Sequence, residues 1–140
     1  MRETTLKSLK TILRMQRETV ERLLSEKSAC FIEIEKLKKE KEITLERLEK
    51  ERHFAGEISS YQTFSEFTKK VQDKIDAVEK AIQSHLLKAS KLEDAFISAY
   101  KRQKSQEIVL EKAEEEKLSL QAIEERKMLD ETALRRFQKG

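Results

Sequence analysis

A heptad pattern of apolar residues runs through the second half of the chain, from Tyr61 to Phe137. One set of its positions is Ile75, Ile82, Ala89, Phe96, Gln103 and Leu110, and the other is Phe64, Val71, Val78, His85, Leu92, Ala99, Gln106, Ala113 and Leu120. Alternating steps of three and four residues return side chains to one face of an α-helix. Neither glycine nor proline interrupts the stretch. It predicts one helix on the order of 115 Å long, too long to be enclosed by a globular core.

The composition favours long helices over a compact domain or a disordered chain. Charged residues make up 41% of the 140 residues and aromatic residues 6%, with two glycines and neither proline nor tryptophan. This bias is typical of coiled coils. High charge alone can also indicate disorder, but the apolar residues of a disordered chain have no reason to keep a fixed period.

The first half of the chain predicts a shorter helix, from residue 4 to about residue 55. Its apolar positions are Leu6, Leu9, Leu13, Val20, Leu23 or Leu24, Cys30 or Phe31, Ile34 and Leu37. Ile34 and Leu45 are eleven residues apart, a spacing that predicts a four-residue stutter near residues 38–41.

A bend is expected at residues 56–60, because Gly56 suits the left-handed conformation that ends many helices. The second helix then covers about residues 61–138, and a short connection makes the two helices antiparallel. The sequence therefore predicts an all-α fold in a single domain over residues 1–140. This fold is a two-helix antiparallel coiled-coil hairpin with a longer, overhanging C-terminal helix.

The overhang comprises about 25 residues after Glu114 that have no partner within the hairpin. Heptad positions in this stretch are charged rather than apolar: Lys117, Glu124, Lys127 and Glu131. Other residues nearby remain apolar, including Leu118, Leu120, Ile123, Met128, Leu129, Leu134 and Phe137. Such a stretch either frays or binds another protein.

Charge and motif content argue against several classes of protein. The net charge of +3 is the remainder of 30 basic and 27 acidic residues interspersed along the chain, whereas a nucleic-acid surface gathers positive charge on one face. No apolar run reaches the roughly 18 residues of a membrane span. Two histidines and one cysteine form no plausible catalytic or metal-binding set. We therefore expect a non-enzymatic cytoplasmic protein without a cofactor, peripheral to a membrane at most.

Two groups of residues are candidates for partner binding. Tyr61, Phe64 and Phe67 follow the predicted bend, and their spacing places them on one helical face. They either close the end of the hairpin or anchor a partner, since aromatic residues are enriched at interfaces. The N-terminal stretch carries Lys7, Lys10, Arg14 and Arg17. These cations form either an ordinary solvated face or a docking surface for an acidic partner.

Several short motifs resemble the FliJ family of flagellar and type III secretion export proteins. They are the Tyr-x-x-Phe at Tyr61 and Phe64, the group Leu92, Glu93, Ala95, Phe96, Lys101 and Lys104, and the C-terminal motif of Glu125, Lys127, Leu129, Asp130 and Glu131. The likeness covers most of the second helix, whereas over the first helix it is one of length and pattern. It extends the candidate partner-binding residues to the C-terminal motif.

The resemblance implies a non-catalytic stalk and adaptor of the export apparatus, similar to the central stalk of rotary ATPases. Its implied partners are a hexameric export ATPase, the cytoplasmic domain of the export gate, and export chaperones. The location it implies is the cytoplasm or the cytoplasmic face of the inner membrane. Two alternatives remain: a structural tether that self-associates through the overhang, and a basic peripheral protein that binds membrane or nucleic acid.

Overall fold

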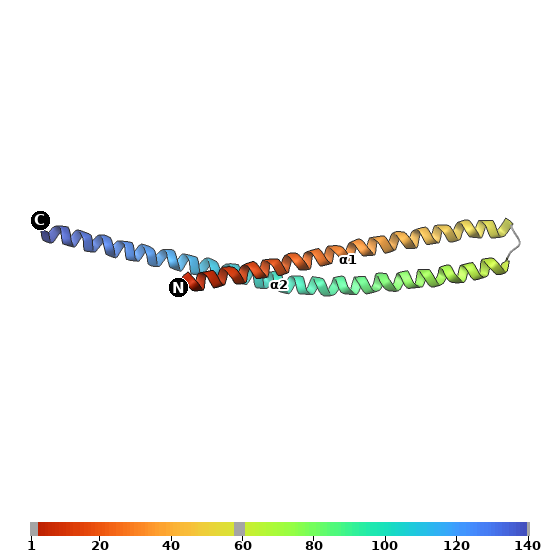
Figure 1. Ribbon diagram of the computed structural model, residues 1–140, viewed down its shortest axis with the longest axis horizontal. Coiled ribbons are helices and arrows are strands. Elements are labelled where there is room, and N and C mark those ends of the chain that lie inside the picture. The colour runs from red at the N-terminus through yellow and green to blue at the C-terminus, as the bar shows by residue number, and fades with distance from the viewer. Residues whose placement is uncertain (1–2, 58–60, 140) are drawn as a thin grey trace. The chain divides into compact units, whose positions relative to one another are not determined.

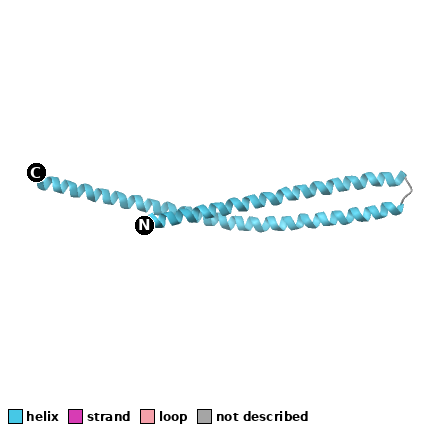
Figure 2. Ribbon diagram, viewed as in Figure 1, coloured by secondary structure: helices cyan, strands magenta, loops and turns pink. Residues whose placement is uncertain are grey.

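The computed structural model describes the backbone of residues 3–57 and 61–139, and the side chains of residues 3–53 and 63–138. It contains two helices, α1 (Glu3–Glu57, 55 residues) and α2 (Tyr61–Lys139, 79 residues), shown in Figure 1. Every described residue is helical, as Figure 2 shows, so the described part of the chain is all-α and has no strand.

The absence of proline and the scarcity of glycine explain how both helices reach this length, because these residues interrupt helices most strongly. The expected left-handed glycine at the end of α1 is wrong. Gly56 lies inside α1, and no described glycine has a positive φ. The remainder of the predicted bend, residues 58–60, lies outside the described residues.

Contacts between residues divide the chain into two compact units, each built from a segment of both helices. The terminal unit consists of Met1–Val20 and Ile97–Gly140, and the middle unit consists of Glu21–Phe96. The single domain expected from the sequence stays a prediction.

The two helices are antiparallel within each unit, because ion pairs early in α1 reach later residues of α2 than ion pairs late in α1 do. The pairs of the terminal unit are Glu3 with Lys117 at 3.8 Å, Lys10 with Glu114 at 3.8 Å, and Arg17 with Glu107 at 3.5 Å. Those of the middle unit are Lys27 with Glu93, Glu40 with Lys74 at 3.7 Å, and Lys41 with Glu79 at 2.9 Å. This arrangement is consistent with the predicted helical hairpin.

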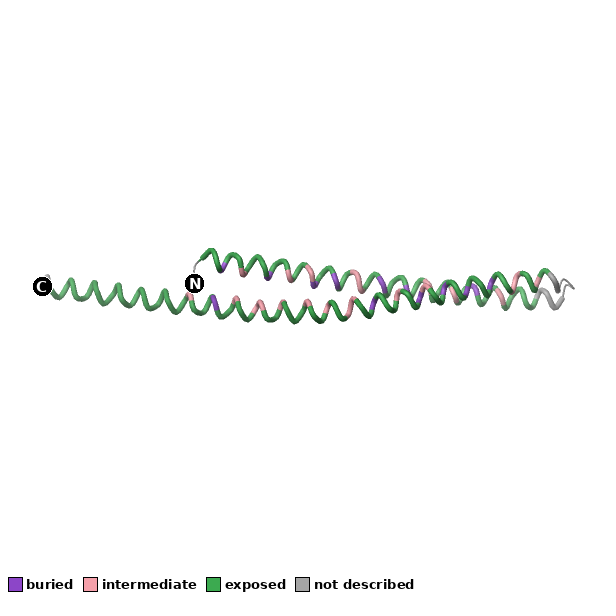
Figure 3. Tube along the Cα trace, turned by 90° about the horizontal axis from the view of Figure 1, so that it is seen from below, coloured by how far each residue is buried: buried purple, intermediate pink, exposed green. Residues whose placement is uncertain are grey.

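Burial follows the predicted heptad positions on both helices, as the purple and pink residues of Figure 3 show. The buried apolar residues are Leu6, Leu13, Val20, Leu23, Cys30 and Ile34 on α1, and Val71, Ile75, Val78, Ile82, Ala89 and Ala113 on α2. Where the sequence left two choices, the smaller or earlier residue is buried: Leu23 rather than Leu24, and Cys30 rather than Phe31.

The predicted stutter in α1 is wrong. Leu45, which it placed among the buried positions, is 40% exposed, and Thr44 is buried at 7%. Thr44 continues the heptad steps from Ile34 and Leu37, so the pattern proceeds without a shift. The threonine hydroxyl can be buried because it donates a hydrogen bond to the backbone oxygen of Glu40 at 2.8 Å, which leaves its polar group satisfied.

The C-terminal segment, defined as Leu118–Lys139, contains no buried residue among its described side chains. Leu120, expected at a heptad position of the core, is 46% exposed. The buried pattern of α2 ends at Ala113 because Lys117 already pairs with Glu3, where the described part of α1 begins. Beyond this point, the terminal unit has no described α1 residue to cover α2.

Candidate partner-binding surfaces

Among the described residues, no group of three or more His, Cys, Asp or Glu side chains is arranged to hold a metal ion. No helix in the described chain has a stretch long and apolar enough to cross a membrane.

The predicted aromatic group lies at the start of α2, in the middle unit. The side chain of Tyr61 lies outside the described residues, while Phe64 and Phe67 are half-buried. Phe64 and Thr68 help to line a shallow depression of about 430 Å³. The ring of Phe64 is therefore partly accessible, and its role as a partner anchor stays a prediction.

The predicted basic group does not form one free positive surface. Lys10 pairs with Glu114, and Arg17 pairs with Glu107, so two of the four cations connect α1 to α2. Lys7 and Arg14 are exposed, and neither has an ion pair within the described part of the chain. Partner binding by the basic group, still a prediction, would rest mainly on these two side chains.

Glu107 is the centre of a polar cluster that joins the helices of the terminal unit. Its carboxylate accepts hydrogen bonds from Gln103 at 3.0 Å, Lys104 at 3.2 Å and Arg17 at 3.5 Å. The hydrogen bond from Gln103 and then that from Lys104 lower the pKa of Glu107. The hydrogen bond to Glu107 and its negative charge raise the pKa of Lys104, whose ammonium also lies 5.2 Å from the centre of the Tyr100 ring.

The C-terminal motif is fully on the surface. Its residues Glu125, Lys127, Leu129, Asp130 and Glu131 are all exposed on α2. The apolar residues around it repeat at eleven rather than seven residues: Leu118 with Leu129, Ala122 with Ala133, and Ile123 with Leu134. An eleven-residue repeat matches a nearly straight helix better than a heptad does. The segment therefore has an apolar face of its own rather than a continuation of the buried heptads.

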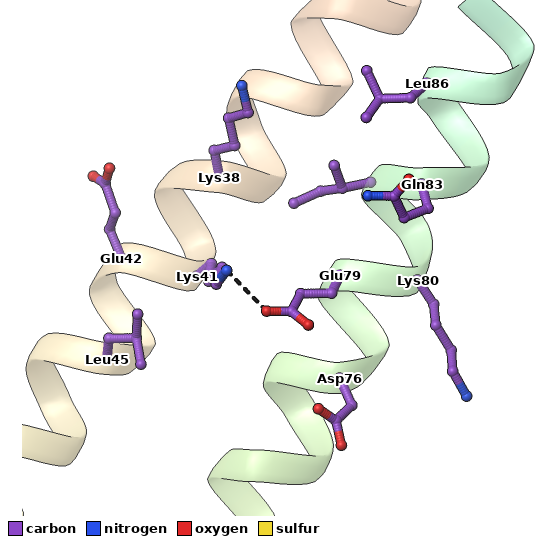
Figure 4. Close-up of a pocket in the computed structure, with 10 residues that line it drawn as sticks. Lys38, Lys41, Glu42, Leu45, Asp76, Glu79, Lys80, Gln83 and Leu86 are labelled. Atoms are coloured by element: carbon purple, nitrogen blue, oxygen red, sulfur yellow. Dashed lines mark ion pairs between the residues drawn. The ribbon is translucent and has the colours of Figure 1, made fainter.

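The middle unit has a groove between α1 and α2 of about 1000 Å³, which we call the middle groove. Its lining residues are Lys38, Lys41, Glu42, Leu45, Asp76, Glu79, Lys80, Ile82, Gln83 and Leu86. Lys41 points toward Glu79 in Figure 4, and their ion pair spans the groove at 2.9 Å. Leu45 and Leu86 are partly exposed there, so a partner helix would find apolar contacts bordered by charges of both signs.

The sequence analysis missed this groove, although the sequence contained a signal for it. Lys41, which lines the groove, occupies a heptad position that a large apolar side chain would otherwise fill. A shorter or polar side chain at such a position leaves space between two helices.

A second groove lies in the terminal unit, with a volume of about 310 Å³, and we call it the terminal groove. Its lining residues are Ile12, Met15, Gln16, Thr19, Ala99 and Arg102. The oxygen Oε1 of Gln16 is buried and has no hydrogen-bond partner within the described residues. Buried polar atoms are usually paired, so the unpaired acceptor indicates that a hydrogen-bond donor is missing from the terminal groove.

Comparison with known families now identifies the chain. Residues 3–140 match the family model described as Flagellar FliJ protein. The chain belongs to the FliJ family. The resemblance noted in the second helix is thus confirmed, and the match also includes the first helix. Comparison with curated proteins gives no match, and neither does comparison with solved structures.

Membership of the FliJ family makes the chain a component of flagellar or type III protein export, and the family is non-enzymatic. The surfaces of this FliJ protein are therefore candidate contact surfaces within the export apparatus.

Proposed function

We propose that this FliJ protein is a non-catalytic stalk and adaptor of the export apparatus. Its proposed partners are the hexameric export ATPase, the cytoplasmic domain of the export gate, and export chaperones. It acts in the cytoplasm or at the cytoplasmic face of the inner membrane. The family match supports the export role, and the long helices support the role of a stalk.

The observation that carries the proposal is the exposure of the C-terminal segment. Large apolar side chains in this segment lie open to solvent: Leu118, Leu120, Ile123, Met128, Leu129, Leu134 and Phe137. A concentration of exposed large apolar side chains in one segment often marks an interaction site. At about 1.5 Å per residue, the segment offers roughly 33 Å of single helix, which a ring of ATPase subunits can surround.

The basic and aromatic groups have separate parts in the proposal. Lys7 and Arg14 are exposed and unpaired within the described chain, so they can steer the approach to an acidic ATPase surface. Such steering changes the association rate more than the final affinity. Phe64 and Phe67, together with Tyr61, are proposed to anchor the export gate.

Deletion of the C-terminal segment from Leu118 onward is the main test of the proposal. The proposal predicts that the truncated protein no longer stimulates its cognate export ATPase in a steady-state assay of phosphate release. The deletion leaves every α1–α2 ion pair of the terminal unit in place. Circular dichroism should therefore show that the truncated protein retains its remaining helices.

A matched pair of point variants separates loss of the apolar face from loss of length. Leu118→Gln with Leu129→Gln keeps the helix but removes two apolar side chains, and we expect stimulation to fall at least about tenfold, as for interface anchors. Glu124→Gln with Arg135→Gln changes two exposed polar side chains on the other side of the same helix and serves as the control. Undiminished stimulation after the full deletion would exclude the stalk role.

A further inference from the structure

The terminal groove is a surface on which a third helix could dock without breaking existing contacts. Ile12 and Met15 are 43% and 59% exposed. At about 100° per residue, Ile12 and Thr19 lie on one side of the buried Leu13, and Lys10 and Arg17 lie on the other. The side that carries Lys10 and Arg17 holds ion pairs to α2. A helix placed along the terminal groove would displace neither pair.

Two polar groups of the terminal groove lack partners in the described chain. Arg102 is exposed and has no ion pair there, and Oε1 of Gln16 is buried without a hydrogen bond. An occupant that fits must therefore supply apolar side chains, one carboxylate and one hydrogen-bond donor. An amphipathic helix with one acidic residue within its apolar face meets these requirements.

The C-terminal segment has this chemistry. Its face formed by Leu118, Ala122, Leu129 and Ala133 is interrupted by one residue, Glu125, which has no ion pair in the described chain. Gln121 lies one helical turn from Glu125 and carries an exposed side-chain amide. The carboxylate matches Arg102, and the amide matches Gln16.

We propose that the terminal groove of one copy of the chain binds the C-terminal segment of a second copy, with Glu125 of that copy paired to Arg102. Arg102 and Glu125 are separated by 23 residues, which places them about 140° apart around α2. The groove and the segment therefore face different directions on one chain. Head-to-tail contacts of this kind build assemblies larger than a dimer, either closed rings or open filaments according to the rotation between copies.

Charge exchange between the two residues tests the proposal on the full chain. Sedimentation velocity over a range of concentrations should show growing assemblies for the wild type and mainly monomer for Arg102→Glu and for Glu125→Arg. An equimolar mixture of the two variants should associate again, because each then meets a partner of opposite charge. Both side chains are exposed, so circular dichroism should show that each variant folds.

A labelled synthetic peptide of residues 118–140 measures the contact directly. We expect Arg102→Glu to weaken its binding to the full chain at least about tenfold, because like charges meet. A peptide with Glu125→Arg should instead prefer that variant. Lys101→Glu, one position away on α2, is the control and should change the affinity little. Equal affinities of wild type and Arg102→Glu for the peptide, or a mixture that stays monomeric, would overturn the proposal.

The self-association proposal and the stalk proposal can be disproved separately. Both use the C-terminal segment, but the test of self-association does not involve the export ATPase. Loss of ATPase stimulation on deletion of the segment, with no self-association of the full chain, would retain the stalk and overturn the inference. The opposite result is also possible: self-association follows the charge exchange, while the deletion leaves ATPase stimulation unaffected. That result would retain the inference and overturn the stalk.

Discussion

The middle and terminal units bury the same heptad pattern but fill it with different side chains. In the middle unit, Ile34, Val78 and Ile82 form a cluster of buried aliphatic residues, with Leu37 packed against it. In the terminal unit, α2 contributes mostly small or polar residues at the heptad positions, namely Ala99, Gln103, Gln106 and Ala113, together with Leu110. Apolar burial stabilises in proportion to the area removed from water. The middle unit should therefore hold its helices together more strongly.

The helices of the terminal unit are joined by polar contacts as well as by apolar burial. Gln106 donates a hydrogen bond from its amide to the backbone oxygen of Leu9 at 3.3 Å, and Glu107 receives three donors. Exposed ion pairs contribute little, about 0–1 kcal/mol each. A unit held this way can open locally more readily, which suits the part of the molecule proposed to engage partners.

The largest expected effect comes from removing a side chain from the aliphatic cluster. Ile34→Ala should lower the free energy of unfolding by about 2–4 kcal/mol, because it removes a transfer contribution and leaves a cavity. Ile32, which is 57% exposed on the same helix, is the matched control. Ile32→Ala should change the free energy of unfolding by less than about 0.5 kcal/mol. Urea denaturation followed by circular dichroism measures both. Equal losses for the two variants would mean that the aliphatic cluster does not stabilise the middle unit more than its exposed positions do, and the expected advantage of this unit would have no basis.

Part of the fold could be predicted from the sequence alone. Heptad spacing predicted both helices and most buried residues, because a fixed period repeats many times and survives single exceptions. The prediction was wrong at Leu45: this larger apolar residue was expected to be buried, but Thr44 is buried instead. That error arose because the hydroxyl of threonine can be satisfied by the backbone of its own helix, which side-chain hydropathy does not reveal.

The candidate surfaces were harder to predict. Lys10 pairs with Glu114, and Arg17 pairs with Glu107. Both ion pairs depend on the register between two helices far apart in sequence. A single helix contains no information about that register. The grooves depend on it as well, since Gln16 and Arg102 are brought together only when α1 and α2 pair. The exposed C-terminal segment was predictable, because only the difference in length between the helices was needed.

A smaller effect, of opposite sign, is expected at the buried amide of the terminal unit. Gln16→Leu should raise the free energy of unfolding by about 1 kcal/mol, because it removes a buried acceptor that lacks a partner. Gln106→Leu is the control: its amide is hydrogen-bonded, so the same substitution should give no gain. Thermal unfolding of the full chain, at a concentration at which it is monomeric, measures both. If Gln16→Leu lowered stability under these conditions, the acceptor would have to be satisfied by solvent.

The smallest expected effect concerns pH and the polar cluster around Glu107. Its pKa is lowered in the folded chain by hydrogen bonds from Gln103 and Lys104. A lowered pKa means that folding favours the ionised carboxylate. The contribution of Glu107 to the free energy of unfolding is therefore present above the unfolded pKa of about 4.3. That contribution is lost as pH falls through the folded pKa. The raised pKa of Lys104 has no influence in this acidic range, because the lysine stays protonated.

The variant Glu107→Gln isolates this contribution, since the amide resembles the protonated acid. The unfolding midpoint of the wild type should exceed that of Glu107→Gln near neutral pH, and the difference should vanish as pH falls below the folded pKa of Glu107. Glu111→Gln, at an exposed acid with no ion pair in the described chain, should show a smaller difference throughout. Amide exchange should place the change in the terminal unit, because Arg17 and Glu107 join α1 to α2 there. A loss of protection centred on the middle unit would mean that the two units do not respond independently, and the contrast between them would have to be abandoned.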